Sequence, residues 1–124
     1  MDEKERALRR WFEAWLTNDG SCIGELFAPD AVYSECWGPV YRGRAQIARW
    51  FADWNAGGRV LAWRIGRVLC AGAGAAAEWY FECEHDGHAA FNGVTLADFG
   101  ADGKIVSLRE FRSDPAHVFP YGDA

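Results

Sequence analysis

The chain has 124 residues, half of them hydrophobic and a quarter charged, which is the size and composition of one ordinary globular domain. A formal charge of -5 argues against a nucleic-acid partner, because such proteins gather Lys and Arg on one surface. No apolar stretch approaches the roughly 20 residues of a membrane span, and the first residues lack a signal peptide's apolar segment. We therefore expect a single domain over residues 1–124, located in the cytoplasm and without a membrane partner.

Aromatic residues are unusually frequent for this length, at 15% with seven Trp. A buried indole N–H needs a hydrogen-bond partner, so some of these rings are expected to line a cavity rather than to fill a core. The four cysteines form no C-x-x-C pair, and the three histidines show no metal-binding spacing. We expect reduced thiols, no metal and no cofactor.

Helical periodicity appears twice in the first half of the chain. A first helix is predicted from Asp2 to a stop at residues 18–20, and a short second helix over residues 21–28 with Ser21 as its cap. Residues 31–36 predict a strand that carries Glu35, and residues 44–54 a third helix. The apolar stripe of the first helix is Leu8, Trp11, Phe12, Trp15 and Leu16, and that of the third is Ile47, Trp50, Phe51 and Trp54.

The second half is strand-like and punctuated by glycine. Strands are predicted over residues 59–71, 75–85, 88–100 and 104–113, joined by turns into an antiparallel meander. Gly93 and Gly100 are expected to bend or bulge it. Alternation in residues 75–85 places Trp79, Phe81 and Cys83 on the inner face and Glu78, Tyr80, Glu82 and Glu84 on the outer face. The tail, residues 114–124, has no regular pattern.

Three local motifs occur in a characteristic order. They are Leu-Phe-Ala-Pro-Asp-Ala-Val-Tyr at 26–33, Gly38 followed by Arg-Gly at 42–43 and Ile47, and Phe-Gly-Ala-Asp-Gly-Lys-Ile-Val at 99–106. Together with the order of elements, they resemble the nuclear transport factor 2-like (NTF2-like) superfamily, in particular its SnoaL-like and ketosteroid isomerase-like branches. The resemblance implies an α+β, cystatin-like fold. A cone-shaped, curved antiparallel sheet would pack against three N-terminal helices, enclose an apolar pocket and form homodimers through its outer face.

The resemblance also suggests site residues. Counting back from Gly38 puts the proton-shuttling base of ketosteroid isomerase-like members at Glu35. The family's oxyanion-hole acids are replaced by Trp11 and Thr95, with Phe51 at a supporting Tyr position, so steroid isomerase activity is not expected.

SnoaL-like cyclases use an acid from the late strands. If Leu108 faces the pocket, Glu110 and Arg112 do so too, whereas the opposite facing brings in Arg109. The Asp-Arg-Asp set of the epoxide hydrolases is only partly available, from Asp98 and one arginine.

Two hypotheses follow. The first is a cofactor-independent isomerase, cyclase or dehydratase/hydrolase acting by carboxylate acid/base chemistry on a small apolar or aromatic metabolite. Glu35 and Glu110 would be its catalytic residues. Its substrate-binding residues would be Trp11, Trp15, Tyr33, Phe51, Trp54, Trp79, Phe81, Thr95 and Arg112. The second is a non-catalytic ligand-binding or dimeric interaction module. Convergence of both carboxyls on one cavity would favour the enzyme.

Overall fold

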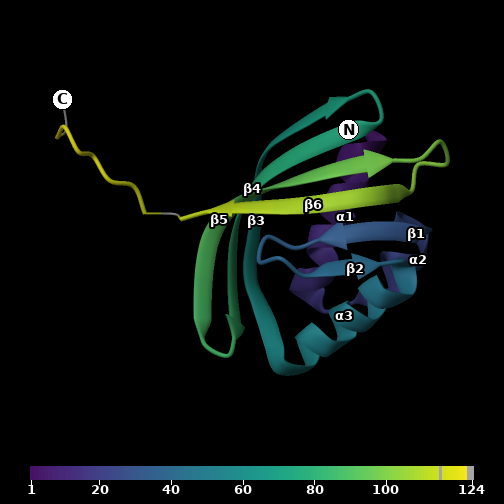
Figure 1. Ribbon diagram of the computed structural model, residues 1–124, viewed down its shortest axis with the longest axis horizontal. Helices are drawn as coiled ribbons and strands as arrows, with labels where there is room; N and C mark the ends of the chain where they lie inside the picture. The colour runs from purple at the N-terminus through teal and green to yellow at the C-terminus, as the bar shows by residue number, and fades with distance from the viewer. Residues whose placement is uncertain (115, 123–124) are drawn as a thin grey trace.

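The computed structural model describes residues 1–114 and 116–122. Three helices, α1 (Glu3–Thr17), α2 (Ile23–Leu26) and α3 (Arg44–Gly57), accompany one curved sheet, with a short 3-10 turn, η1 (Gly20–Cys22), before α2. The strands are β1 (Phe27–Ser34), β2 (Val40–Arg42), β3 (Gly58–Ala71), β4 (Gly74–His85), β5 (His88–Phe99) and β6 (Ile105–Ser113). Figure 1 shows the sheet wrapped around α1, with α3 beside β1 and β2.

The sheet has the order β2-β1-β6-β5-β4-β3 and does not close. Each neighbouring pair is antiparallel except β1 and β6, which are parallel, so the sheet is mixed. The predicted α+β class, with a curved sheet over three helices, is confirmed. Only the β1–β6 pair departs from the expected antiparallel pattern, because β1 reaches the sheet from the helical half of the chain rather than through a hairpin.

Helix α1 forms for the reasons visible in its sequence. The Asp2 carboxylate accepts a hydrogen bond from the Lys4 backbone N–H at 2.7 Å, and Asn18 ends the helix in the left-handed region at φ 53°. Its apolar stripe is buried against the sheet, except for Leu16, which is 38% exposed. The stripe is therefore narrower than predicted.

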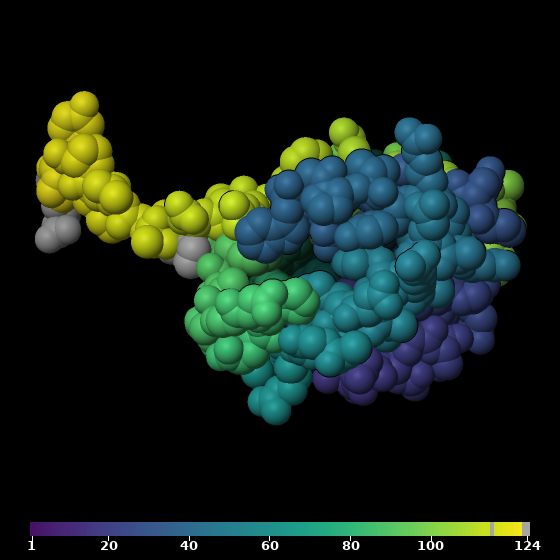
Figure 2. All heavy atoms as spheres, turned by 60° about the horizontal axis from the view of Figure 1, so that its bottom comes forward, coloured from purple at the N-terminus to yellow at the C-terminus, as the bar shows by residue number. Residues whose placement is uncertain are grey.

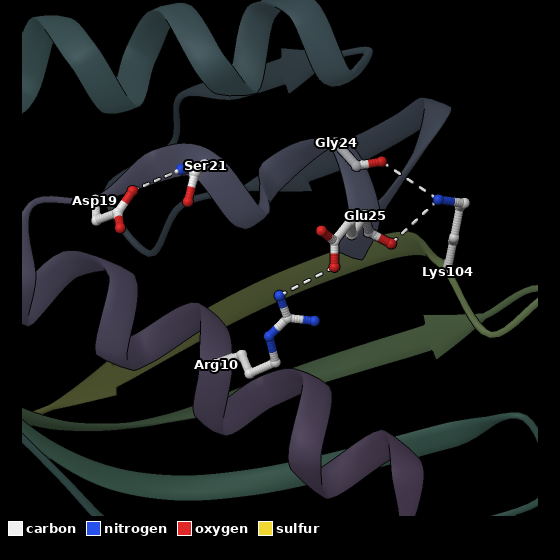
Figure 3. Close-up of polar contacts among 6 residues, drawn as sticks. All are labelled: Arg10, Asp19, Ser21, Gly24, Glu25 and Lys104. Atoms are coloured by element: carbon white, nitrogen blue, oxygen red, sulfur yellow. Dashed lines mark hydrogen bonds and ion pairs between the residues drawn. The ribbon is translucent and has the colours of Figure 1, made fainter.

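The second helix is shorter than predicted. It ends at Leu26, and Phe27 already pairs with Ile105 as the first residue of β1. The Asp19 carboxylate, rather than Ser21, caps this region by accepting from the Ser21 backbone N–H at 3.0 Å (Figure 3). Pro29 disfavours a helical conformation at the residue before it, so the chain becomes extended earlier than the apolar pattern indicates.

The last hairpin anchors α2 to the sheet. In the turn before β6, the Lys104 ammonium donates to the backbone carbonyls of Gly24 and Glu25 at 3.3 and 3.2 Å (Figure 3). These carbonyls belong to the end of a helix, where acceptors lack partners within the helix and favour a cation. The Phe-to-Val motif at 99–106 thus connects β5 and β6 and also fixes α2.

Candidate functional site

A small cavity opens at one end of the sheet. Figure 2 shows a hollow between the β1–β2 hairpin (blue), α3 (teal) and the β4–β5 hairpin (green). Its volume is about 60 Å³. Its lining residues are Trp15, Glu35, Cys36, Trp37, Trp50, Trp54, Trp63, Trp79, Phe81, Cys83, Phe91 and Glu110. Larger grooves run along α1 and across the sheet, but eight of the twelve residues that line this cavity are aromatic and two are carboxylic acids.

The two carboxyls of the cavity come from different parts of the chain. Glu35 follows β1 in the tight β1–β2 hairpin, where its backbone N–H donates to the Pro39 carbonyl at 2.9 Å. Glu110 lies on β6 opposite Thr95 of β5, and Leu108, two residues earlier on the same face, is fully buried. The parallel pairing of β1 with β6 brings the hairpin and the end of β6 together.

Burial raises the pKa of Glu110 to about 8, and the nearby charge of Glu35 adds to that rise. A hydrogen bond from Tyr33 opposes it without cancelling it. Burial also raises the pKa of Glu35, against a hydrogen bond from Tyr41 and the charge of His85. Glu110 therefore keeps its proton at neutral pH and can act as an acid or as a hydrogen-bond donor.

A chain of hydrogen bonds fixes Glu110 from behind. The Trp11 indole N–H donates to the Tyr33 hydroxyl at 3.0 Å, and that hydroxyl donates to Glu110 Oε2 at 2.6 Å. Trp11 and Tyr33 are both completely buried, so neither ring can move without disrupting the core. One carboxyl oxygen of Glu110 is thus held in place by the core.

The wall of the cavity is positioned by strand register. Trp79 of β4 pairs with Gly93 of β5, and a Cβ at Gly93 would overlap the Trp79 ring. The Trp79 indole N–H donates to the Thr95 hydroxyl at 2.9 Å. The β4–β5 register is continuous through Gly93, so of the predicted bend or bulge, a bulge is absent from this pair. Its role is to leave space for an indole.

The rim is formed by stacked aromatic and basic groups. The Arg112 guanidinium carbon lies 4.0 Å from the centre of the Trp37 ring, and Trp37 packs edge-on against Phe91 at 5.3 Å. On the other side, His85 stacks on Trp54 with 4.8 Å between ring centres. Trp37 is 53% exposed and marks the entrance.

Six of the eleven predicted site residues line the cavity: Glu35, Glu110, Trp15, Trp54, Trp79 and Phe81. Trp11, Tyr33, Phe51 and Thr95 are buried behind it and do not form its wall, and Arg112 lies at the rim. At the oxyanion-hole positions, the Trp11 indole N–H is occupied because it donates to Tyr33, and the Thr95 hydroxyl is completely buried and accepts from the Trp79 indole N–H. Asp98 is exposed and does not line the cavity, so it adds no carboxyl to Glu35 and Glu110.

Six lining residues were absent from the predicted site: Cys36, Trp37, Trp50, Trp63, Cys83 and Phe91. On α3, Trp50 and Trp54 face the cavity while Phe51 faces the core, a division that the apolar stripe alone does not reveal. Phe81 pairs with Trp63 of β3 on one side and with Phe91 of β5 on the other. Directly paired residues share a face of the sheet, so these two registers are what place Trp63 and Phe91 beside Phe81 in the cavity wall.

Two indole N–H groups in this region, those of Trp15 and Trp63, are buried without a hydrogen-bond partner among the described residues. Both rings pack among other aromatic rings, including each other at 6.4 Å between centres. Within residues 1–114 and 116–122, no cluster of three or more His, Cys, Asp or Glu could hold a metal ion. In that same part of the chain, no helix is long and apolar enough to cross a membrane.

The model of the SnoaL-like domain family matches residues 8–108. The chain belongs to the SnoaL-like domain family. The resemblance to the NTF2-like superfamily is thereby confirmed. A search of the curated proteins found no match.

Solved structures share the SnoaL-like fold. A protein with a ketosteroid isomerase-like fold from Catenulispora acidiphila, in complex with trimethylamine, is 26% identical over 86% of this chain and 85% of that one, with a TM-score of 0.72. An LEH-like epoxide hydrolase from M. tuberculosis is 18% identical over 90% and 83%, with a TM-score of 0.79. An NTF-2 like protein of unknown function from Burkholderia xenovorans is 18% identical over 96% and 89%, with a TM-score of 0.76. At 18% identity the last two support the fold alone.

Proposed function

We propose that this SnoaL-like protein is a cofactor-independent enzyme that moves protons on a small, largely apolar metabolite, as an isomerase, cyclase or dehydratase/hydrolase. The observation that carries the proposal is the convergence of Glu35 and Glu110 on one aromatic cavity, each with a raised pKa. Two carboxyls that share a dry site cannot both be ionised easily, so one holds a proton while the other accepts one.

The surroundings of the two carboxyls support different roles for them. Glu110 is held by Tyr33 and, with a pKa of about 8, is protonated at neutral pH. It is the acid that donates a proton or hydrogen bond to a developing oxyanion. Glu35, which accepts from the Tyr41 hydroxyl at 3.2 Å, is the base. Activity should therefore fall as the pH rises through about 8, because Glu110 then loses its proton.

The size of the cavity narrows the substrate. About 60 Å³ is far below the roughly 300 Å³ or more of pockets for drug-sized ligands. The complex of the Catenulispora acidiphila protein with trimethylamine supports a ligand of small size. Among these reaction types, epoxide hydrolysis has the least support, since Asp98 is exposed and lies outside the cavity.

The alternative is a ligand-binding or dimeric interaction module without chemistry. The outer face of the sheet supports a homodimer, because Val94 and Phe111 pair across β5 and β6 there and are 36% and 50% exposed. Dimerisation by itself is compatible with both functions, so proton transfer must decide between them.

The test is hydrogen exchange on carbon. The protein is incubated in D2O with a panel of small ketones, and loss of each α-proton signal is followed by NMR. We expect exchange with at least one compound, its loss in Glu35→Gln, and normal exchange in Glu13→Gln, which changes an exposed carboxyl on α1. Exchange that persists in Glu35→Gln would eliminate Glu35 as the base, and ligand binding without any exchange would favour the binding module.

A further inference from the structure

The cavity wall is built mainly of aromatic rings and carboxyls. Eight of its twelve lining residues are aromatic, two are carboxylic acids and two are cysteines. Among the described residues, none of those that line it is Lys, Arg or His. The faces of Trp and Phe rings attract cations, most strongly for Trp, and six of the seven Trp contribute here.

The two carboxyls have no cation as a hydrogen-bonding partner. Glu110 is bonded by the Tyr33 hydroxyl and Glu35 by the Tyr41 hydroxyl, both of which are neutral. Arg112, the basic group at the rim, lies over the Trp37 ring and outside the lining. The charge of His85 favours ionised Glu35, whereas Glu110 has no positive group at hydrogen-bonding distance and keeps its proton, so a positive ligand would stabilise the ionised form of Glu110.

The volume limits the positive group to a compact one. At 10–15 Å³ for each water-sized atom, about 60 Å³ accommodates roughly four to six non-hydrogen atoms. A methylated ammonium group has this size. Its weakly hydrated, apolar surface suits aromatic walls, whereas Na⁺ or a primary ammonium would lose strong hydration there.

We propose that the ligand of this cavity carries an alkylated ammonium group, held among the Trp rings with Glu35 and Glu110 as its counter-ions. The inference rests on the proposed function, in that it names the charge of the substrate of the same site. It also makes binding proton-coupled: a cation stabilises the ionised form of Glu110, so affinity rises with pH, whereas turnover needs the protonated form and is favoured below a pH of about 8.

Several other titratable or charged groups lie around the carboxyl pair. Tyr33 and Cys36 come from β1 and its hairpin, Tyr41 from β2, Cys83 and His85 from β4, and Arg112 from β6. Burial raises the pKa of Cys36 to about 11 and also raises the pKa of Tyr33, Tyr41 and Cys83. These four therefore stay neutral while Glu110 titrates.

The experiment compares choline with 3,3-dimethyl-1-butanol, its neutral counterpart of the same shape. Binding is measured by calorimetry and by Trp fluorescence at constant ionic strength set with NaCl. We expect choline to bind at least tenfold more tightly. Its affinity should rise up to tenfold between pH 7 and pH 9, because the ionised fraction of a group with a pKa of about 8 rises about tenfold over that range.

Variants assign the effect to the cavity. Glu110→Gln should abolish the pH dependence, and Glu35→Gln should weaken choline binding about tenfold, whereas Glu13→Gln should bind as the wild type does. If a cavity variant does not fold, the comparison of the two ligands on the wild-type protein still decides.

Two outcomes overturn the inference in distinguishable ways. The first outcome is that 3,3-dimethyl-1-butanol binds as tightly as choline or more tightly, or that a small cyclic ketone does so by engaging the unpartnered indole N–H groups. It would contradict a positively charged ligand but not the proposed enzyme. Absence of binding by all three ligands, together with no carbon-proton exchange, removes both proposals.

Discussion

The proton held by Glu110 predicts an unusual dependence of stability on pH. In the native state the pKa of Glu110 is about 8, whereas the ordinary pKa of a glutamate is 4.5. Between those values the folded protein binds more protons than the unfolded chain, so stability is highest at low pH and is lost as the pH rises. Most carboxylates in ion pairs have the opposite effect.

The magnitude follows from the size of the shift. At about 1.4 kcal/mol for each pKa unit, a rise from 4.5 to about 8 sets an upper limit of about 5 kcal/mol, of which about 4 kcal/mol falls between pH 5 and pH 9. The neutral variant Glu110→Gln lacks this titration and keeps an oxygen that can accept from Tyr33. Its stability relative to the wild type should therefore increase by up to about 4 kcal/mol across that range.

The assay is urea unfolding of both proteins, followed by far-UV circular dichroism at five pH values from 5 to 9. Glu13→Gln serves as the control for removing an exposed carboxyl, and should parallel the wild type. Direct titration of the Glu110 carboxyl by carbon-13 NMR gives an independent measurement of its pKa. Parallel stability profiles for wild type and Glu110→Gln, or a carboxyl that titrates near 4.5, would show that Glu110 does not keep its proton at neutral pH.

Two further predictions concern the groups that support the site. Tyr33→Phe removes the hydrogen bond that lowers the pKa of Glu110 and leaves the buried Trp11 N–H unpaired. The pKa of Glu110 should therefore rise further, and stability should fall by about 1–3 kcal/mol. NMR titration measures the pKa and urea unfolding the stability, and an unchanged pKa would contradict the hydrogen-bond chain. Gly93→Ala places a Cβ against the Trp79 ring and should cost about 1–3 kcal/mol and alter Trp fluorescence. Gly72→Ala is a partial control for Gly93→Ala. A Cβ at Gly72 meets no neighbouring atom within 4 Å, but the φ of 56° at this position adds local strain.

Much of the fold was predictable because it depends on local patterns. The stripe of α1, the Asp86–Gly87 turn and the alternation in β4 each follow from neighbouring residues, and the structure places them as predicted except for Leu16 of the stripe, which is exposed. The end of α2 was misjudged, because the pairing of Phe27 with Ile105 outweighs local helical preference. The strand β2 was not predicted, since three exposed or half-buried residues carry no periodic signal.

Local sequence patterns were enough to predict the α+β class, the two candidate acids and an excess of Trp that would line a cavity or fill the core. Which Trp residues line the cavity depends on how the chain folds in three dimensions. Trp11 was expected in the wall but bonds Tyr33 behind it, whereas Trp50 and Trp63 line the cavity. The physical reason is that strand register and the parallel β1–β6 pair act between residues far apart in the chain. They bring Glu35 and Glu110 together, and burial of the pair then raises the pKa of each.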